Sequence, residues 1–135
     1  MRNIFLDTNF LIDYFIRDDF KSTSSVVFQK FSNKGDKFYI SFLSVANFSY
    51  IMRKLPDENR EIIIGKMCSI FEVVPNNGNQ IMRALNLKPR DFEDALQYEA
   101  AMDAGCDCII TRNQKDFAFS KIPVMSAAEY LALYT

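Results

Sequence analysis

Residues 4–9 read Ile4-Phe5-Leu6-Asp7-Thr8-Asn9 and contain the first short apolar run of the chain. Similar runs follow at residues 38–42, 70–74 and 108–111. None of them alternates polar with apolar residues, which is typical of strands buried on both faces of a parallel sheet. Segments with helical spacing lie between them. The pattern predicts a three-layer α/β/α sandwich with a central parallel sheet of four to five strands.

Apolar residues with helical spacing predict the helices that cover this sheet. They occur at residues 11–15, 26–31, 45–55, 62–70, 81–85, 92–102 and about 127–133. Asp57 and Ser126 are expected to be N-caps, and Gly105 is expected to end the helix before the fourth strand.

Length and composition set the class of protein. The 135 residues, 49% hydrophobic and 24% charged, predict one globular domain spanning residues 1–135. A net charge of −1 argues against binding nucleic acid by bulk positive charge. The chain contains no histidine, which excludes His-ligated zinc and Ser-His or Cys-His catalysis.

Three cysteines without framework spacing suggest a reducing compartment. Cys106 and Cys108 are interpreted as small core residues. No apolar run approaches the length of a membrane span, and no signal-peptide pattern is present, so we expect a cytoplasmic protein with no membrane partner.

Polar side chains gather where the predicted strands end. In open α/β sheets, ligands bind beyond the carboxyl ends of the strands. The candidates are Asp7, Thr8 and Asn9 after the first strand, Ser44 and Asn47 after the second, Thr111, Asn113 and Asp116 after the fourth, and Asp91 and Asp94 before the fourth.

These residues offer oxygen ligands, which suit Mg²⁺ or Mn²⁺. Neighbouring carboxylates repel one another unless a cation or a proton relieves them. A metal held there would support hydrolysis of a phosphodiester without a protein nucleophile. We expect Asp7, Asp94 and Asp116 to bind the metal.

Each of these residues also has a purely local interpretation. Asp91 and Asp94 have the spacing of an N-cap and the third residue of a helix. Asp7 could cap the helix that starts at Thr8. Asp116 could be an ordinary loop residue, and Asn113 could serve a turn.

Three motifs together resemble the PIN-domain family. They are Ile4-Phe5-Leu6-Asp7-Thr8-Asn9, Asp91-Phe92-Glu93-Asp94-Ala95-Leu96, and Ile110-Thr111-Arg112-Asn113 through Asp116-Phe117. The likeness spans essentially the whole chain, down to a strand at Ile122-Pro123-Val124 and a closing helix. Length and order are most similar to the VapC-like toxin ribonucleases of bacterial toxin–antitoxin pairs.

The resemblance implies a Mg²⁺- or Mn²⁺-dependent endoribonuclease that cleaves RNA. The catalytic set would be Asp7, Asp94, Asn113 and Asp116. The family's second acid usually stands where this chain has Asn47. An amide oxygen can coordinate a cation but adds no charge, so weaker metal binding and slower cleavage are expected.

The resemblance also implies a homodimer and an antitoxin that inserts a side chain, often basic, among the acids. Aromatic residues on the early helices are expected to be incompletely covered and to mark such an interaction surface. They are Phe10, Tyr14, Phe28, Phe48 and Tyr50. The alternative is that these rings fill the core.

Three other functions fit parts of the sequence. Asn47 suggests a catalytically weak PIN-like module that binds RNA or a partner protein. A phosphoacceptor receiver domain would need an Asp after the third strand, where Val74 is followed by Pro75-Asn76-Asn77. A haloacid-dehalogenase-type phosphatase would need Asp at position 9, which is Asn9.

Overall fold

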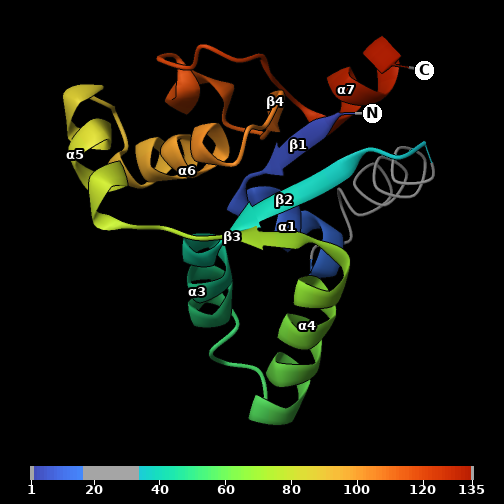
Figure 1. Cartoon of the computed structure of the whole chain (residues 1–135). Coiled ribbons are helices and arrows are strands. Elements are labelled where there is room, and N and C mark those ends of the chain that lie inside the picture. Colours follow the sequence, from blue (N-terminus) through green and yellow to red (C-terminus); the bar gives the residue numbers. More distant parts are fainter. Residues whose placement is uncertain (1, 17–33, 135) are drawn as a thin grey trace.

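The computed structural model describes residues 2–16 and 34–134, and an all-parallel sheet lies at its centre (Figure 1). The strand order is β3-β2-β1-β4-β5. This five-stranded sheet confirms the predicted α/β class. The strands are β1 (Asn3–Leu6), β2 (Lys37–Ser41), β3 (Glu72–Val74), β4 (Cys108–Ile110) and β5 (Val124–Met125).

Helices cover both faces of the sheet (Figure 1). The helix expected at residues 26–31 lies outside the described residues. The described helices are α1 (Thr8–Phe15), α3 (Phe42–Ile51), α4 (Asp57–Ile70), α5 (Gly78–Asn86), α6 (Phe92–Asp103) and α7 (Ala127–Tyr134), with a 3₁₀ turn η1 (Gln114–Phe117).

The central strand β1 sends alternate side chains into two cores. Ile4 and Leu6 belong to a cluster with residues of α1, α3, α4 and α7. Phe5 belongs to the opposite cluster, with Tyr98 of α6. All three β1 residues are fully buried, and Figure 1 places α3 and α4 on the side of the sheet opposite α6. The layers of the predicted sandwich are therefore confirmed.

The two cysteines interpreted as core residues are buried as predicted. Cys108 packs in the first cluster and Cys106 in the second, and both are free thiols. Gly105 follows α6 with φ of 72°, a conformation that favours glycine at a helix end. Ser126 Oγ accepts from the backbone N–H of Glu129 at 3.0 Å, which confirms it as the cap of α7.

The bounds of four predicted strands differ from those in the structure. The second strand ends at Ser41, one residue early, because the Ser41 hydroxyl accepts from Ser44 N and starts α3 at Phe42. That helix ends at Ile51, short of the predicted Leu55. The third strand starts at Glu72, because Ile70 still belongs to α4. The fourth strand ends at Ile110, one residue early, and the fifth is Val124–Met125 instead of Ile122-Pro123-Val124, since Pro123 has no backbone N–H to donate.

Asp57 is not the N-cap of α4. Pro56 occupies the cap position without a side-chain bond, and Asp57 is the first helical residue. Its carboxylate instead accepts from the Arg60 guanidinium one turn along.

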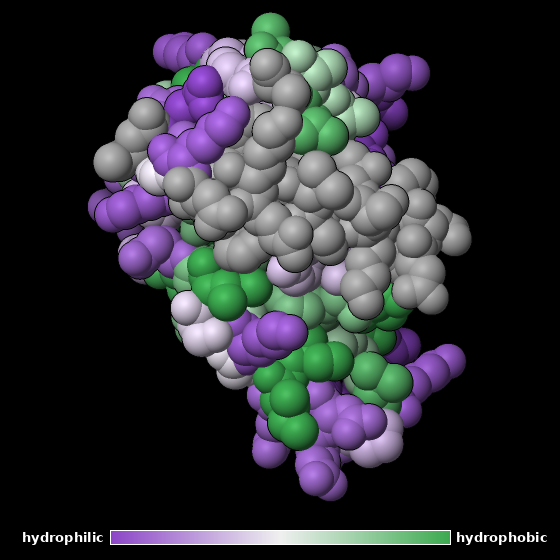
Figure 2. Space-filling view, turned by 90° about the vertical axis from the view of Figure 1, so that its right-hand side faces the viewer, coloured by the Kyte–Doolittle hydropathy of each residue, from purple (hydrophilic) through white to green (hydrophobic). Residues whose placement is uncertain are grey.

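The expectation of exposed early aromatics was wrong for two rings. Phe10 and Phe48 are buried, at 3% and 0% exposure, because α1 and α3 pack against the same face of the sheet. Tyr14 is partly buried, and Tyr50 is 65% exposed. Phe28 lies outside the described residues. Figure 2 shows hydrophobic side chains at the surface of one face, among hydrophilic ones.

No helix within residues 2–16 and 34–134 is long and apolar enough to cross a membrane.

Candidate functional site

An open pocket, here called the acidic pocket, lies at the carboxyl edge of the sheet. The loops after β1 and β4, the α3 helix and the start of α6 surround it. Its lining includes most of the predicted site residues. Those residues are Asp7, Thr8, Asn9, Asn47, Asp91, Asp94, Asn113 and Asp116, joined by Ile12, Tyr50, Ile51 and Glu93. Only Ser44 and Thr111 of the predicted set do not line it.

Asp7 is the most deeply buried acid of the pocket, at 4% exposure. One carboxylate oxygen accepts from the Thr8 backbone N–H at 2.8 Å. The other accepts from Thr111 Oγ1 at 2.8 Å and from Asn9 Nδ2 at 3.5 Å. Asp7 therefore caps α1 and lines the pocket at the same time, so its local and functional interpretations are compatible.

Burial raises the pKa of Asp7 above its ordinary value, because a charged carboxylate loses water there. The hydrogen bonds from Thr111, Thr8 and Asn9 and the nearby Arg112 charge oppose that rise. Burial and these polar contacts therefore act on the pKa of Asp7 in opposite directions, and burial is the larger effect.

The pKa of the Asp94 carboxyl group is raised strongly. Burial first, and then the charges of Asp7, Asp91, Asp116 and Glu93, raise its pKa to about 8. The contributions of these four charges reflect acids that lie near enough to Asp94 to repel its charged form. The predicted convergence of Asp7, Asp94 and Asp116 therefore has direct electrostatic support.

Asp91 acts as the helix cap that its spacing predicted. Its side chain accepts from the Asp94 backbone N–H at 3.1 Å at the start of α6. It also lines the pocket and contributes to the raised pKa of Asp94.

Asn113 and Asp116 lie at the two ends of one turn after β4. The Asp116 backbone N–H donates to the Asn113 carbonyl at 3.0 Å, and the Asn113 N–H donates to Thr111 Oγ1 at 3.0 Å. Thr111 thus links this turn to Asp7, to which its hydroxyl donates. Both side chains line the acidic pocket, Asn113 exposed and Asp116 partly so.

Asn47 contacts an acid that the sequence analysis did not select. Its Nδ2 donates to Glu93 Oε1, so α3 and α6 meet across the pocket through this pair. Burial and the charges of Asp91 and Asp7 raise the pKa of Glu93. Two features of the sequence could have identified Glu93. It is an acid within the Asp91–Asp94 motif that had no proposed role, and position 47 lacks the acid that is usual in the family.

Ser44 belongs to a buried polar network behind the pocket. Its hydroxyl lies 2.9 Å from Thr8 Oγ1 and accepts from Gln97 Nε2 at 2.8 Å. Gln97 Oε1 accepts from Ser41 Oγ at 2.5 Å. Gln97 is a second residue that the sequence analysis missed, and its signal was a polar residue inside an apolar stretch of α6.

Basic side chains flank the acids on one side. Arg90, Arg112 and Lys115 line a neighbouring hollow that shares Asn113 and Asp116 with the acidic pocket. The Arg112 guanidinium also donates to Asp13 at 2.8 Å, which ties the loop after β4 to α1.

A PIN domain family model matches residues 3–115. The chain belongs to the PIN-domain family. The match contains Asp7, Asp94 and Asn113, and Asp116 lies one residue beyond it. The assignment of Asp116 therefore depends on its place in the acidic pocket.

A known relative and several solved structures are similar to this chain along most of its length. Ribonuclease VapC1 of Aquifex aeolicus (strain VF5) is 27% identical over 134 residues, covering 94% of this chain and 92% of that protein.

Solved structures share the fold at lower identity. VapBC-1 from nontypeable Haemophilus influenzae has a TM-score of 0.71 at 19% identity and covers 93% of this chain and 98% of that chain. FitAcB from Neisseria gonorrhoeae has a TM-score of 0.73 at 14% identity, with the same coverage of 93% and 98%. At these identities the likeness establishes the PIN-type fold.

The donor set of the acidic pocket fits the divalent cation that PIN-domain nucleases generally use. The acids offer oxygen ligands and mutual repulsion that a cation would relieve. In the described part of the chain, no group of three or more His, Cys, Asp or Glu side chains is arranged to hold a metal ion by itself. Mg²⁺ commonly keeps several waters and binds proteins through one or two carboxylates. The wide spacing of the acids is therefore compatible with this ion.

Proposed function

We propose that this chain is a metal-dependent endoribonuclease and the toxin of a toxin–antitoxin pair. The observation that carries the proposal is the convergence of Asp7, Asp94 and Asp116 in one pocket of a PIN domain. The similarity to Ribonuclease VapC1 supports RNA as the substrate class. We further propose that residues 1–135 form a single domain and that the protein is cytoplasmic.

Asp7, Asp94 and Asp116 are the residues that would hold Mg²⁺ or Mn²⁺, with Asn113 beside them. When bound, such an ion lowers the pKa of a water ligand and neutralises charge on phosphate oxygens. Thr111, Thr8 and Asn9 fix the Asp7 carboxylate by donating to its two oxygens.

The protonation of Asp94 depends on whether a cation is bound. With a pKa of about 8, its carboxyl group keeps a proton near neutral pH. A divalent cation favours the charged form and would release that proton.

The basic hollow beside the pocket suits the RNA backbone. Arg90, Arg112 and Lys115 would pair with phosphates that flank the cleaved bond, while the acids face the reacting phosphate. This local arrangement makes RNA binding compatible with the net charge of −1.

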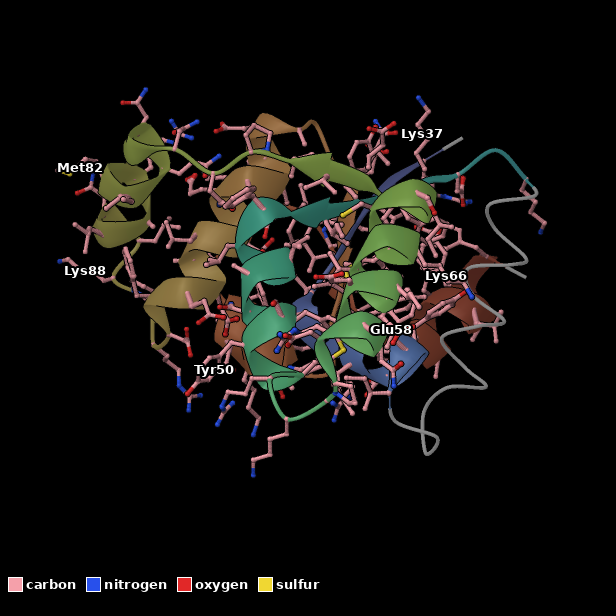
Figure 3. All side chains as sticks on the ribbon, turned by 90° about the horizontal axis from the view of Figure 1, so that it is seen from below. Lys37, Tyr50, Glu58, Lys66, Met82 and Lys88 are labelled. Carbon is pink, nitrogen blue, oxygen red and sulfur yellow. The ribbon has the colours of Figure 1, made fainter. Side chains whose placement is uncertain are left out.

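The acidic pocket also suits the predicted antitoxin segment. Ile12, Tyr50 and Ile51 supply an apolar wall next to the acids. A basic side chain with an apolar stem matches both parts, because its head pairs with carboxylates and its stem packs on the wall. Figure 3 shows Tyr50 between the ends of α3 and α6.

A homodimer remains part of the proposal, with exposed apolar residues as its support. Phe42 and Tyr50 of α3 and Ile62 of α4 are 67%, 65% and 64% exposed. Large exposed apolar side chains favour association, and two-fold pairing is the commonest form. Light scattering over a tenfold concentration range tests it, and a constant monomer mass would contradict it.

The second candidate is a catalytically weak PIN module that binds RNA or a protein. Asn47 favours it, since the amide adds no charge at the family's second acidic position.

Cleavage of a structured RNA, with Mn²⁺ and with EDTA, separates the two candidates. The ribonuclease proposal expects Mn²⁺-stimulated cleavage that EDTA stops. RNA binding that survives EDTA, without metal-stimulated cleavage, would favour the binding module instead.

A further inference from the structure

We infer that Glu93 supplies the carboxylate that the chain lacks at position 47, and that Asn47 is the residue that positions it. The inference deepens the proposed function, because it concerns the same metal site. It assigns a role to Glu93, an acid of the pocket that is neither in the proposed metal set nor a helix cap.

The geometry behind this inference is a contact between two layers of the fold. Asn47 lies on α3, which follows β2, and Glu93 is the second residue of α6. The amide Nδ2 of Asn47 donates to Glu93 Oε1 across 46 residues of sequence. Both side chains line the acidic pocket with Asp7 and Asp94.

The pairing explains why an amide stands at position 47. A carboxylate there would meet the Glu93 carboxylate as a like charge, whereas the amide offers an N–H that holds it. The acidic charge then reaches the pocket from α6 instead of α3. Glu93 then lines the pocket together with the three proposed metal ligands Asp7, Asp94 and Asp116, and with the helix cap Asp91.

A role for Glu93 at the helix terminus alone does not account for this contact. An acid in the first turn stabilises a helix through the dipole from a solvent-facing position. Asp91 already caps this terminus through the Asp94 backbone N–H. The Glu93 side chain is exposed, but it also accepts from the amide of Asn47 on another element and lines the pocket.

The test is Mn²⁺ binding to the full chain, measured by calorimetry at pH 8. Glu93→Gln removes the charge and is expected to weaken Mn²⁺ binding about 10- to 100-fold. Asn47→Ala leaves the Glu93 charge but removes the amide that holds the carboxylate, so a smaller loss of Mn²⁺ affinity is expected. Glu58→Gln on α4, outside the pocket, is the matched control and should bind Mn²⁺ like the parent (Figure 3).

A charge exchange makes the test specific. The double variant Asn47→Glu/Glu93→Gln returns the carboxylate to α3 and lets the amide on α6 donate to it. Its Mn²⁺ affinity should recover to within about threefold of the parent, since a purely structural role would not be rescued this way. Thermal unfolding without metal checks that each variant is folded.

The outcomes separate this inference from the proposed function. Parent-like Mn²⁺ affinity in Glu93→Gln would overturn the inference even if the parent cleaves RNA. Loss in Glu93→Gln and recovery in the double variant would support it even if no RNA is cleaved, in which case the ribonuclease proposal fails alone. A parent chain that binds no Mn²⁺ would overturn the inference as well.

Discussion

Gln97 donates through its Nε2 to Ser44 Oγ at 2.8 Å, linking two side chains that are 53 residues apart. Gln97 Oε1 accepts from Ser41 Oγ, so a single amide bonds to both ends of the β2–α3 junction. Gln97 is 1% exposed and both serines are fully buried. The relationship fixes α6, which carries Asp94, against α3, which carries Asn47.

Gln97→Leu should destabilise the protein. The substitution keeps the approximate size of the side chain but removes the acceptor of the buried Ser41 hydroxyl and a donor to the buried Ser44 hydroxyl. The expected cost is about 1–3 kcal/mol in free energy of unfolding. Urea unfolding measures the loss. Gln114→Leu, at an exposed glutamine, should change the free energy of unfolding by less than about 0.5 kcal/mol. Equal effects of both substitutions would contradict a structural role for the network.

Asp7→Asn should abolish metal-dependent cleavage and keep the fold. The variant loses the buried charge, but it keeps a side-chain oxygen that can accept from the Thr8 N–H. We expect a loss of about 100-fold or more in cleavage rate, because the metal's transition-state stabilisation is worth several kcal/mol. The melting temperature should stay within about 4 °C of the parent. Cleavage at the parental rate under saturating Mn²⁺ would refute the site assignment.

Thr111→Val should impair activity more than stability. The Thr111 hydroxyl orients the Asp7 carboxylate at 2.8 Å and receives the Asn113 N–H, so its loss frees both the acid and the turn. Removing a group that orients a ligand typically lowers metal affinity or activity about 10- to 100-fold. Mn²⁺ titration of parent and variant measures the effect. An unchanged Mn²⁺ affinity would show that this bond does not support the site.

Stability without metal should fall as the pH rises from about 4 to about 8. The folded pKa of Asp94 is about 8, above its ordinary value of 3.8, so the folded state binds more protons than the unfolded state in this window. Stability therefore decreases with rising pH there. The raised pKa values of Asp7 and Glu93 act in the same direction.

Urea unfolding at pH 5 and pH 8, in EDTA, checks this dependence. Asp94→Asn should reduce the difference between the two pH values, and Mg²⁺ should reduce it in the parent. Glu58→Gln, outside the acidic pocket, should leave the difference unchanged. A parent chain that is more stable at pH 8 than at pH 5 would contradict the predicted repulsion.

The sequence predicted the sheet because its strands are buried on both faces. Runs such as Ile4–Leu6 and Cys108–Ile110 have no solvent-facing side, and only a parallel sheet between helices explains that pattern. The strand ends were harder to predict. Phe42 is apolar, yet it starts α3 because the Ser41 hydroxyl caps the helix there.

The acids of the pocket were predictable because the carboxyl ends of parallel strands share one edge. Asp7, Asp94 and Asp116 were selected from their places at the ends of predicted elements and from the resemblance to the PIN-domain family. Predicting the Asn47–Glu93 contact would have required knowing how α3 and α6 are oriented about their own axes. The spacing of apolar residues does not define that orientation. Phe10 and Phe48 were misjudged for the same reason, since burial depends on which helix faces meet.

The position of β1 between β2 and β4 has a consequence for synthesis of the protein. The Asp7 backbone N–H donates to the Ile110 carbonyl, and the Asp7 carboxylate accepts from Thr111, 104 residues later. A nascent chain on the ribosome therefore contains Asp7 from the start but lacks the strand beside it until most of the chain has been translated. Such long-range pairing forms late. A truncated product of interrupted translation would lack an assembled pocket and would be inert toward its producer.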